Sequence, residues 1–109
     1  MDQRLVEQFK KAIGHEAVLT EPVQLVTYEC DALPHLRSTP ELVLLPRSAA
    51  DVQAIVRICS QESVPFVARG HGTGLSGGAL PVPGGVVISL AKLNRVLDVD
   101  IPNHRVTVE

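Results

Sequence analysis

The chain has 109 residues, which suits one domain, and 45% of them are hydrophobic while only 3% are aromatic. Its formal net charge is −2 and its lysines and arginines are scattered, so nothing favours a nucleic acid as partner. No apolar stretch approaches the roughly 20 residues that span a bilayer, and the N-terminus lacks the apolar core of a signal peptide. We therefore expect a cytoplasmic protein with a valine- and leucine-rich α/β core.

A docking helix is predicted over residues 2–13, because its apolar residues recur at helical spacing. Gly14 follows it, where a C-cap glycine belongs. Residues 25–28 are expected to form a short strand or turn, and the stretch around Pro34 and Pro40 is expected to be mostly loop. The apolar positions of the helix are Leu5, Val6, Phe9 and Ile13.

A βαβ unit is predicted next. Residues 42–45 form an apolar run that Pro46 ends, as in a buried strand. Ser48 is expected to cap a helix that runs to about Glu62, and a second strand follows over 64–69. Such a unit is right-handed, and ligands in open α/β sheets bind at the carboxyl ends of the strands. The apolar stripe of the helix is expected to comprise Val52, Ile55, Val56 and Cys59.

Three further strands are predicted in the last part of the chain. In the third, Val106 is expected to face inward and Thr107 outward. The chain stops at Glu109 inside this strand, so we expect a truncated piece of a longer protein. An unpaired apolar edge strand invites pairing, which predicts self-association through it. The three strands are predicted at residues 86–90, 95–99 and 105–108.

The most informative feature is a glycine-rich loop between two of these predicted strands. Glycine has no Cβ and accepts positive φ, so consecutive amides can turn inward and form a concave nest for an anion such as a pyrophosphate. Arg69 at the strand end would add a charge-assisted contact. The loop reads Arg69-Gly70-His71-Gly72-Thr73-Gly74-Leu75-Ser76-Gly77-Gly78.

Two better-known phosphate motifs do not fit this loop. The Walker A frame fits from Gly72 to Gly77, but Gly78 and Ala79 stand where the lysine and the hydroxyl should be. The dinucleotide pattern G-x-G-x-x-G also matches, through Gly74, yet a helix must begin inside that motif. The prolines and glycines that follow preclude a helix. The sequence therefore favours a helix-free loop between two strands.

The pattern P-x-x-x-R-G-x-G-T-x-L-S-G-G-A-x-P, with Tyr-x-x-Asp-Ala upstream and Leu-Pro-Arg-Ser before a helix, resembles a known family. It is similar to the FAD-linked oxidases of the vanillyl-alcohol oxidase or p-cresol methylhydroxylase (PCMH) type, from about Tyr28 to the last residue. Within that family it resembles the glycolate oxidase flavoprotein subunit and D-lactate dehydrogenase. The resemblance implies an α/β (α+β) fold, the N-terminal subdomain of the PCMH-type FAD-binding fold. Residues 1–24 would then be an N-terminal helix and linker, and 25–109 the first part of the FAD-binding domain.

The resemblance also implies a cofactor site. Some relatives attach the flavin covalently through a histidine at a position where this chain has Thr73, so a non-covalent FAD is implied. His71 lies two residues earlier and is expected to be a solvated loop position. The residues implied to hold the FAD pyrophosphate are Arg69, Gly70, His71, Gly72, Thr73, Gly74, Ser76, Gly77 and Gly78.

For the intact protein the resemblance implies oxidation of a 2-hydroxy acid, glycolate or D-lactate, by hydride transfer to the flavin. Partner subunits, through which the protein would reach the membrane periphery, belong to the same expectation. This segment alone is expected to be inactive, because no catalytic constellation or metal-ligand spacing is found in it. Two alternatives remain open: an oxidase of the same fold acting on another alcohol, and a non-catalytic α/β module whose loop binds a simple anion or only makes a turn.

Tyr28 and Asp31 match the upstream part of the family pattern. A tyrosine packed on the sheet and an aspartate that fixes a turn explain these two residues equally well. The sequence does not choose between a functional and a structural role for them.

Overall fold

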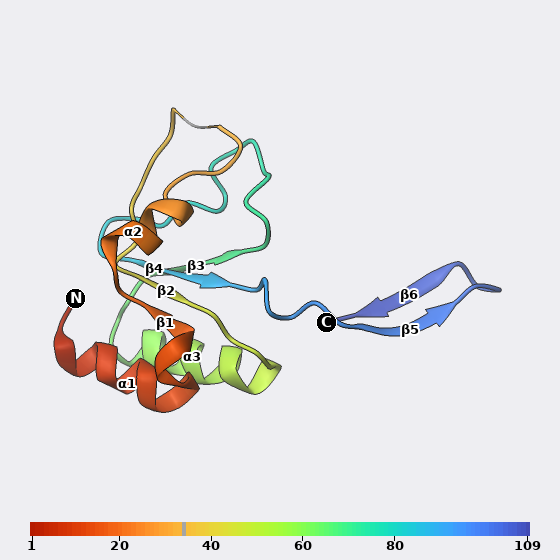
Figure 1. The fold of residues 1–109 in the computed structure, drawn as a ribbon, viewed down its shortest axis with the longest axis horizontal. Coiled ribbons are helices and arrows are strands. Elements are labelled where there is room, and N and C mark those ends of the chain that lie inside the picture. Colours follow the sequence, from red (N-terminus) through yellow and green to blue (C-terminus); the bar gives the residue numbers. More distant parts are fainter. Residues whose placement is uncertain (34) are drawn as a thin grey trace.

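Two parts make up the structure, a mixed α/β body and a β-hairpin that extends away from it (Figure 1). The computed structural model describes residues 1–33 and 35–109, so the expectation for Pro34 lies outside the described residues. The predicted α/β class is confirmed. The body contains α1 (Gln3–Ile13), β1 (Val18–Leu19), α2 (Pro22–Leu25), β2 (Leu42–Leu44), α3 (Ala49–Gln61), β3 (Phe66–Arg69) and β4 (Val86–Ser89), and the hairpin contains β5 (Val96–Asp100) and β6 (Arg105–Val108).

Helix α1 begins and ends where the sequence predicts. The Asp2 carboxylate accepts a hydrogen bond from the Arg4 N–H at 3.0 Å and so caps the first turn. Gly14 ends the helix at φ 96°, a value that favours glycine, and its N–H donates to the Lys10 carbonyl. The apolar face, which includes the fully buried Phe9, packs against the sheet. The predicted docking helix and its C-cap glycine are thus confirmed.

Helix α3 is also capped as predicted. The Ser48 hydroxyl accepts from the Asp51 N–H at 3.1 Å, and the helix ends at Gln61. Cys59, a member of the predicted stripe, is 1% exposed, and its burial raises the pKa of the thiol to about 11. Ile58 is buried as well, although the predicted stripe did not include it. None of the helices in the described part of the chain is long and apolar enough to cross a membrane.

The sheet of the body confirms the predicted βαβ unit, because β2 and β3 run parallel in one sheet with α3 between them in the chain, and it adds a strand between the two. Its strand order is β1-β2-β4-β3, with β2, β4 and β3 parallel and β1 antiparallel to β2. Strands β2 and β3 are therefore parallel, but β4 lies between them. Val86, Val87 and Ile88 of β4 are almost completely buried, as suits a central strand covered on both faces. Phe66 of β3 is 46% exposed, as suits an edge strand.

Different helices pack on the two faces of the sheet. Helices α1 and α3 lie on one face and α2 on the other (Figure 1). In β2, Leu42 and Leu44 point toward α1 and α3, whereas Val43 packs with Leu25 and Tyr28 on the opposite face. This period of two is that of a strand buried on both sides.

Residues 25–28, expected as a short strand or turn, are helical. They span the end of α2 and a 3₁₀ turn, Val26–Tyr28. Pro22 occupies the first turn of α2, where its fixed φ favours a helix and its missing N–H costs nothing. Leu25 is 7% exposed, so one turn of helix suffices to place an apolar side chain on the sheet.

The hairpin corrects one prediction. Strands β5 and β6 lie within about one residue of their predicted positions and pair antiparallel with each other. Val106 was expected to face inward, but it is 57% exposed. The reason is that β5 and β6 pair only with one another, and no element in residues 1–33 or 35–109 covers either face of the hairpin.

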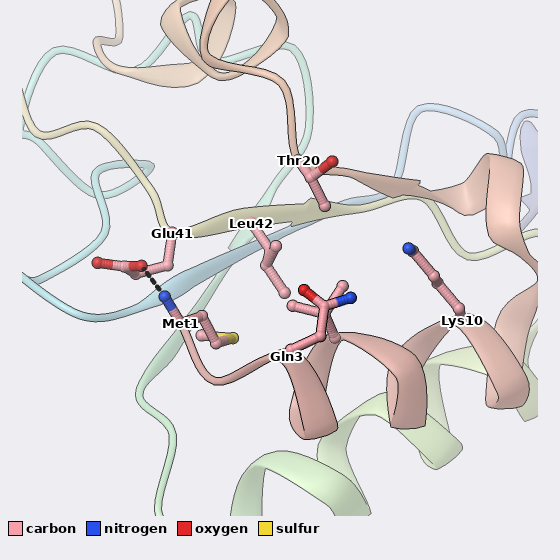
Figure 2. A pocket seen from close by; sticks show the side chains of 7 residues that line it. Met1, Gln3, Lys10, Thr20, Glu41 and Leu42 are labelled. Carbon is pink, nitrogen blue, oxygen red and sulfur yellow. Dashed lines mark hydrogen bonds and ion pairs between the residues drawn. The ribbon is translucent and has the colours of Figure 1, made fainter.

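A hollow of about 370 Å³ lies between the start of α1 and β2 (Figure 2). The Met1 ammonium forms an ion pair with the Glu41 carboxylate at 2.8 Å across it, which ties the start of the helix to the start of the strand. The remaining lining residues are Gln3, Val6, Lys10, Thr20 and Leu42.

Gly85 lies where three backbone segments meet. Its carbonyl accepts from the Glu41 N–H and its N–H donates to the Val82 carbonyl, each at 2.9 Å. A Cβ at this position would lie 2.9 Å from the Val82 carbonyl oxygen and 3.1 Å from that of Pro65. Both are backbone atoms, so neither neighbour can rotate away.

We therefore predict that Gly85→Ala lowers the free energy of unfolding by about 1–3 kcal/mol, measured by urea denaturation. Gly78→Ala is the matched control, because a Cβ there meets nothing within 4 Å. The control is expected to change stability by less than about 0.5 kcal/mol. Equal effects of the two substitutions would contradict the explanation by close approach.

Candidate functional site

The glycine-rich loop leaves the carboxyl end of β3 and returns to the start of β4, its parallel neighbour (Figure 1). It carries a hollow of about 390 Å³. Eight of the nine predicted site residues line this hollow, and the ninth, Gly77, does not. The lining residues are Ala68, Arg69, Gly70, His71, Gly72, Thr73, Gly74, Leu75, Ser76, Gly78 and Ala79.

A second hollow of about 350 Å³ adjoins the first, since both include Gly70 and His71. Its other lining residues follow the carboxyl end of β4 and were not predicted as site residues. Because β3 and β4 are parallel, their carboxyl ends meet at one edge of the sheet, which brings the two stretches together. These additional residues are Leu90, Ala91, Leu93 and Asn94.

The glycines of the loop serve two purposes. Gly72 and Gly77 have φ of 70° and 74°, so the chain turns there in the left-handed region. At Gly70, Gly74 and Gly78 an added Cβ would meet nothing within 4 Å. At these three positions the main chain itself borders open space, as a site that receives a phosphate on backbone groups requires.

Arg69 is fixed by contacts with the upstream segment and with the loop itself. It is 9% exposed, and its Nη1 donates to the Cys30 carbonyl at 2.7 Å. Its guanidinium carbon lies 5.5 Å from the centre of the Tyr28 ring, within range of a cation–π contact. A Cβ at Gly72 would overlap the guanidinium, so the arginine occupies the space that this glycine leaves.

Asp31 joins the loop to the upstream segment. The side chain is 8% exposed, and its Oδ1 accepts from the Leu33 N–H at 2.7 Å, which fixes a turn. Its Oδ2 accepts from the Gly77 N–H at 2.8 Å, across 46 positions of sequence. Tyr28 packs on the sheet beside Val87. Both structural explanations of the Tyr-x-x-Asp pattern hold, and the bond to Gly77 is an addition that the sequence did not predict.

The geometry fits a phosphate group carried on main-chain atoms, with a buried cation at its base. Residues 40–109 match the family described as FAD binding domain. The chain belongs to this family. FAD is the cofactor that such domains bind, and the fit described above agrees with it.

Relatives and solved structures agree with this assignment. The chain is 41% identical over 92 residues to glycolate oxidase subunit GlcD of Escherichia coli K12, covering 84% of this chain and 18% of the relative. It is 35% identical over 107 residues to a probable mitochondrial D-lactate dehydrogenase of Danio rerio, covering 98% and 22%. The structure of p-cresol methylhydroxylase with substrate bound matches at a TM-score of 0.75 and 27% identity, covering 89% of this chain and 20% of that one.

These findings confirm the resemblance to PCMH-type flavoproteins and the fold that it implied. The chain spans about a fifth of the length of the curated relatives that it matches. An alkyldihydroxyacetonephosphate synthase, at a TM-score of 0.83 and 20% identity over 92% of this chain and 21% of that one, shows the same fold and nothing more. The individual contacts of the nine loop residues with the cofactor stay a prediction.

The contact between Arg69 and Gly72 predicts a coupled effect on stability. Gly72→Ala should lower the free energy of unfolding both through strain at positive φ and through overlap with the guanidinium. In the Arg69→Ala background only the strain remains, so the effect of Gly72→Ala should be smaller by about 0.5–3 kcal/mol. Urea denaturation of the four proteins of the cycle measures this difference. If Gly72→Ala had the same effect in both backgrounds, the Arg69 side chain would move aside without a cost in free energy, and the predicted coupling would be absent.

Proposed function

We propose that the hollow over residues 68–79 holds the pyrophosphate of FAD and that the flavin is bound without a covalent link. One observation carries the proposal: in a chain of the FAD binding domain family, a helix-free glycine loop presents bare main chain to a hollow at the carboxyl edge of the sheet. Thr73 offers no imidazole for flavin attachment. When bound, FAD supplies the hydride acceptor.

The protein's part in this site is binding and charge neutralisation. Main-chain N–H groups of the loop donate to phosphate oxygens, as in other backbone nests. Arg69 adds a positive charge that is screened little by solvent, because the residue is buried. Its bond to Cys30 fixes where that charge lies.

We further propose that the intact protein oxidises a 2-hydroxy acid. The substrate then loses a hydride to the flavin and a proton to a base, and becomes a 2-oxo acid. The support is that relatives named for glycolate, D-lactate and D-2-hydroxyglutarate share one substrate class. One of these relatives is named as a subunit, which supports partner subunits for the intact protein as well.

Two substitutions in the intact protein test the cofactor site. Arg69→Ala removes the buried cation, and Gly72→Val places a side chain where the guanidinium lies and displaces it. Each substitution should therefore raise the dissociation constant for FAD about tenfold or more. Flavin absorbance of the purified protein and titration of the apoprotein with FAD measure the effect. A colourless intact protein would favour a non-catalytic module instead.

Matched controls separate loss of the site from general damage. Arg57→Ala removes an exposed arginine of α3. Gly84→Val places a side chain at φ 78° outside the hollow. Both controls should leave flavin occupancy unchanged. Unchanged occupancy in the two site variants as well would sink the assignment.

We also propose that the 109-residue chain self-associates through its hairpin. In the β5–β6 ladder Val96 lies opposite Val108 and Val99 opposite Val106, with a bulge between positions 96 and 98. Residues two apart on β6 share a face, so all four valines lie on one face of the hairpin. Each is between 57% and 61% exposed, and within the described residues no element covers them. A second copy would supply an identical apolar face.

Light scattering tests this association. Val99→Lys and Val106→Lys should shift the 109-residue chain toward the monomer, because each places a charge in the apolar face. Thr107→Lys, on the opposite face, is the matched control and should leave the association unchanged. A monodisperse monomer for the unmutated chain at micromolar concentration would contradict the proposal.

A further inference from the structure

The contact between the glycine loop and the upstream segment is concentrated in three consecutive residues. Cys30 accepts from the Arg69 guanidinium at 2.7 Å, Asp31 accepts from the Gly77 N–H at 2.8 Å, and the Ala32 N–H donates to the Gly74 carbonyl at 3.2 Å. In chain order, these loop partners are Arg69 at the start of the loop, then Gly74, then Gly77. One short stretch of chain therefore holds the loop from Arg69 to Gly77.

Asp31 is the side chain that this stretch contributes to the contact. Its carboxylate is mostly buried, and each of its two oxygens accepts one main-chain N–H, that of Leu33 and that of Gly77. A carboxylate can accept on both oxygens at once, whereas an amide offers one acceptor and turns a donor toward the other N–H. The arrangement therefore requires the acid rather than its amide.

Gly77 is the one predicted site residue that does not line the hollow, and its N–H donates to Asp31. Its N–H is directed at the carboxylate, and its φ of 74° sets the course of the chain that follows. Gly78, the next residue, lines the hollow and borders open space. The bond thus fixes Gly77 and, with it, the position of Gly78 and Ala79, which line the hollow.

We propose that Asp31 is a positioning residue of the cofactor site, which anchors the loop through Gly77 in the shape that receives the diphosphate. This role rests on the proposed function. A loop held in its bound shape before the cofactor arrives loses less conformational freedom on binding, and the affinity is correspondingly higher. Gly77 then serves as the anchor point of the loop and not as a ligand of the phosphate.

The test is Asp31→Asn in the intact protein, with two measurements. Hydrogen exchange of the Gly77 amide should become about tenfold faster or more, because its acceptor is lost or weakened. The dissociation constant for FAD, measured by titration of the apoprotein, should rise about tenfold. Asp98→Asn, which alters an exposed carboxylate on the hairpin, is the matched control and should change neither.

The outcomes separate positioning from mere stability. Faster exchange at Gly77 with weaker FAD binding, while the amide of the buried Val87 exchanges as before, supports the proposal. Unchanged exchange at Gly77, or faster exchange with unchanged FAD affinity, overturns it. If Asp31→Asn does not fold, Asp31→Glu, which keeps the charge and displaces the oxygens, is measured in the same way with the same expected directions.

Failure of the proposed function would look different. If the unmutated intact protein does not bind FAD, both the cofactor assignment and this role for Asp31 are overturned. Exchange at Gly77 would still respond to Asp31→Asn in that case, since the hydrogen bond exists without the cofactor.

Discussion

A loop that joins two neighbouring parallel strands without a helix has no regular hydrogen bonds of its own, and this constraint governs the whole site. Parallel strands are usually joined by a crossover helix, which satisfies its own backbone and covers the sheet. Residues 70–85 contain neither helix nor strand. Their conformation must therefore be fixed largely from outside. Asp31 and Ala32 bond to Gly77 and Gly74 in the first half of the loop. In the second half, the Ser38 hydroxyl donates to the Pro81 carbonyl and the Glu41 N–H donates to the Gly85 carbonyl. A loop with exposed main chain and no helix or strand suits a phosphate. For the same reason it depends on hydrogen bonds from other parts of the chain.

The strand order places that support where it is needed. Because β4 lies between β2 and β3, the loop begins at an edge strand and ends at the central one. The segment after α2 lies over the face of the sheet that Val43 and Val87 share, beside the path of the loop. Tyr28 packs into that cluster and also lies against the Arg69 guanidinium. Burial of this face therefore fixes the upstream segment, and the upstream segment fixes the loop.

The sequence predicts local features well and distant ones poorly. The caps at Ser48 and Gly14 depend on neighbours within four residues, and the structure confirms both. The insertion of β4 between β2 and β3 depends on pairing across the chain, and the exposure of Val106 depends on which elements cover the hairpin. Neighbouring residues in the sequence show neither feature. Strand order is set by distant pairing, and alternating valines look the same in a covered strand and in an uncovered one.

In the candidate site, too, the local features were predicted from the sequence and the distant contacts were not. Eight of the nine residues predicted from the glycine loop and the family resemblance line one hollow, because they are nearly consecutive in the chain. The partners that hold the nest are 39 to 46 positions away, and only the match of Tyr28 and Asp31 to the family pattern pointed to them.

A buried carboxylate close to an anion site opposes the anion, so its presence needs a compensating gain. The Arg69 guanidinium, bonded to the residue that precedes Asp31, offsets that charge, while the carboxylate gives the loop a fixed shape. In the proposed site the two residues form one unit, in which the cation attracts the diphosphate and the anion orients the backbone that binds it.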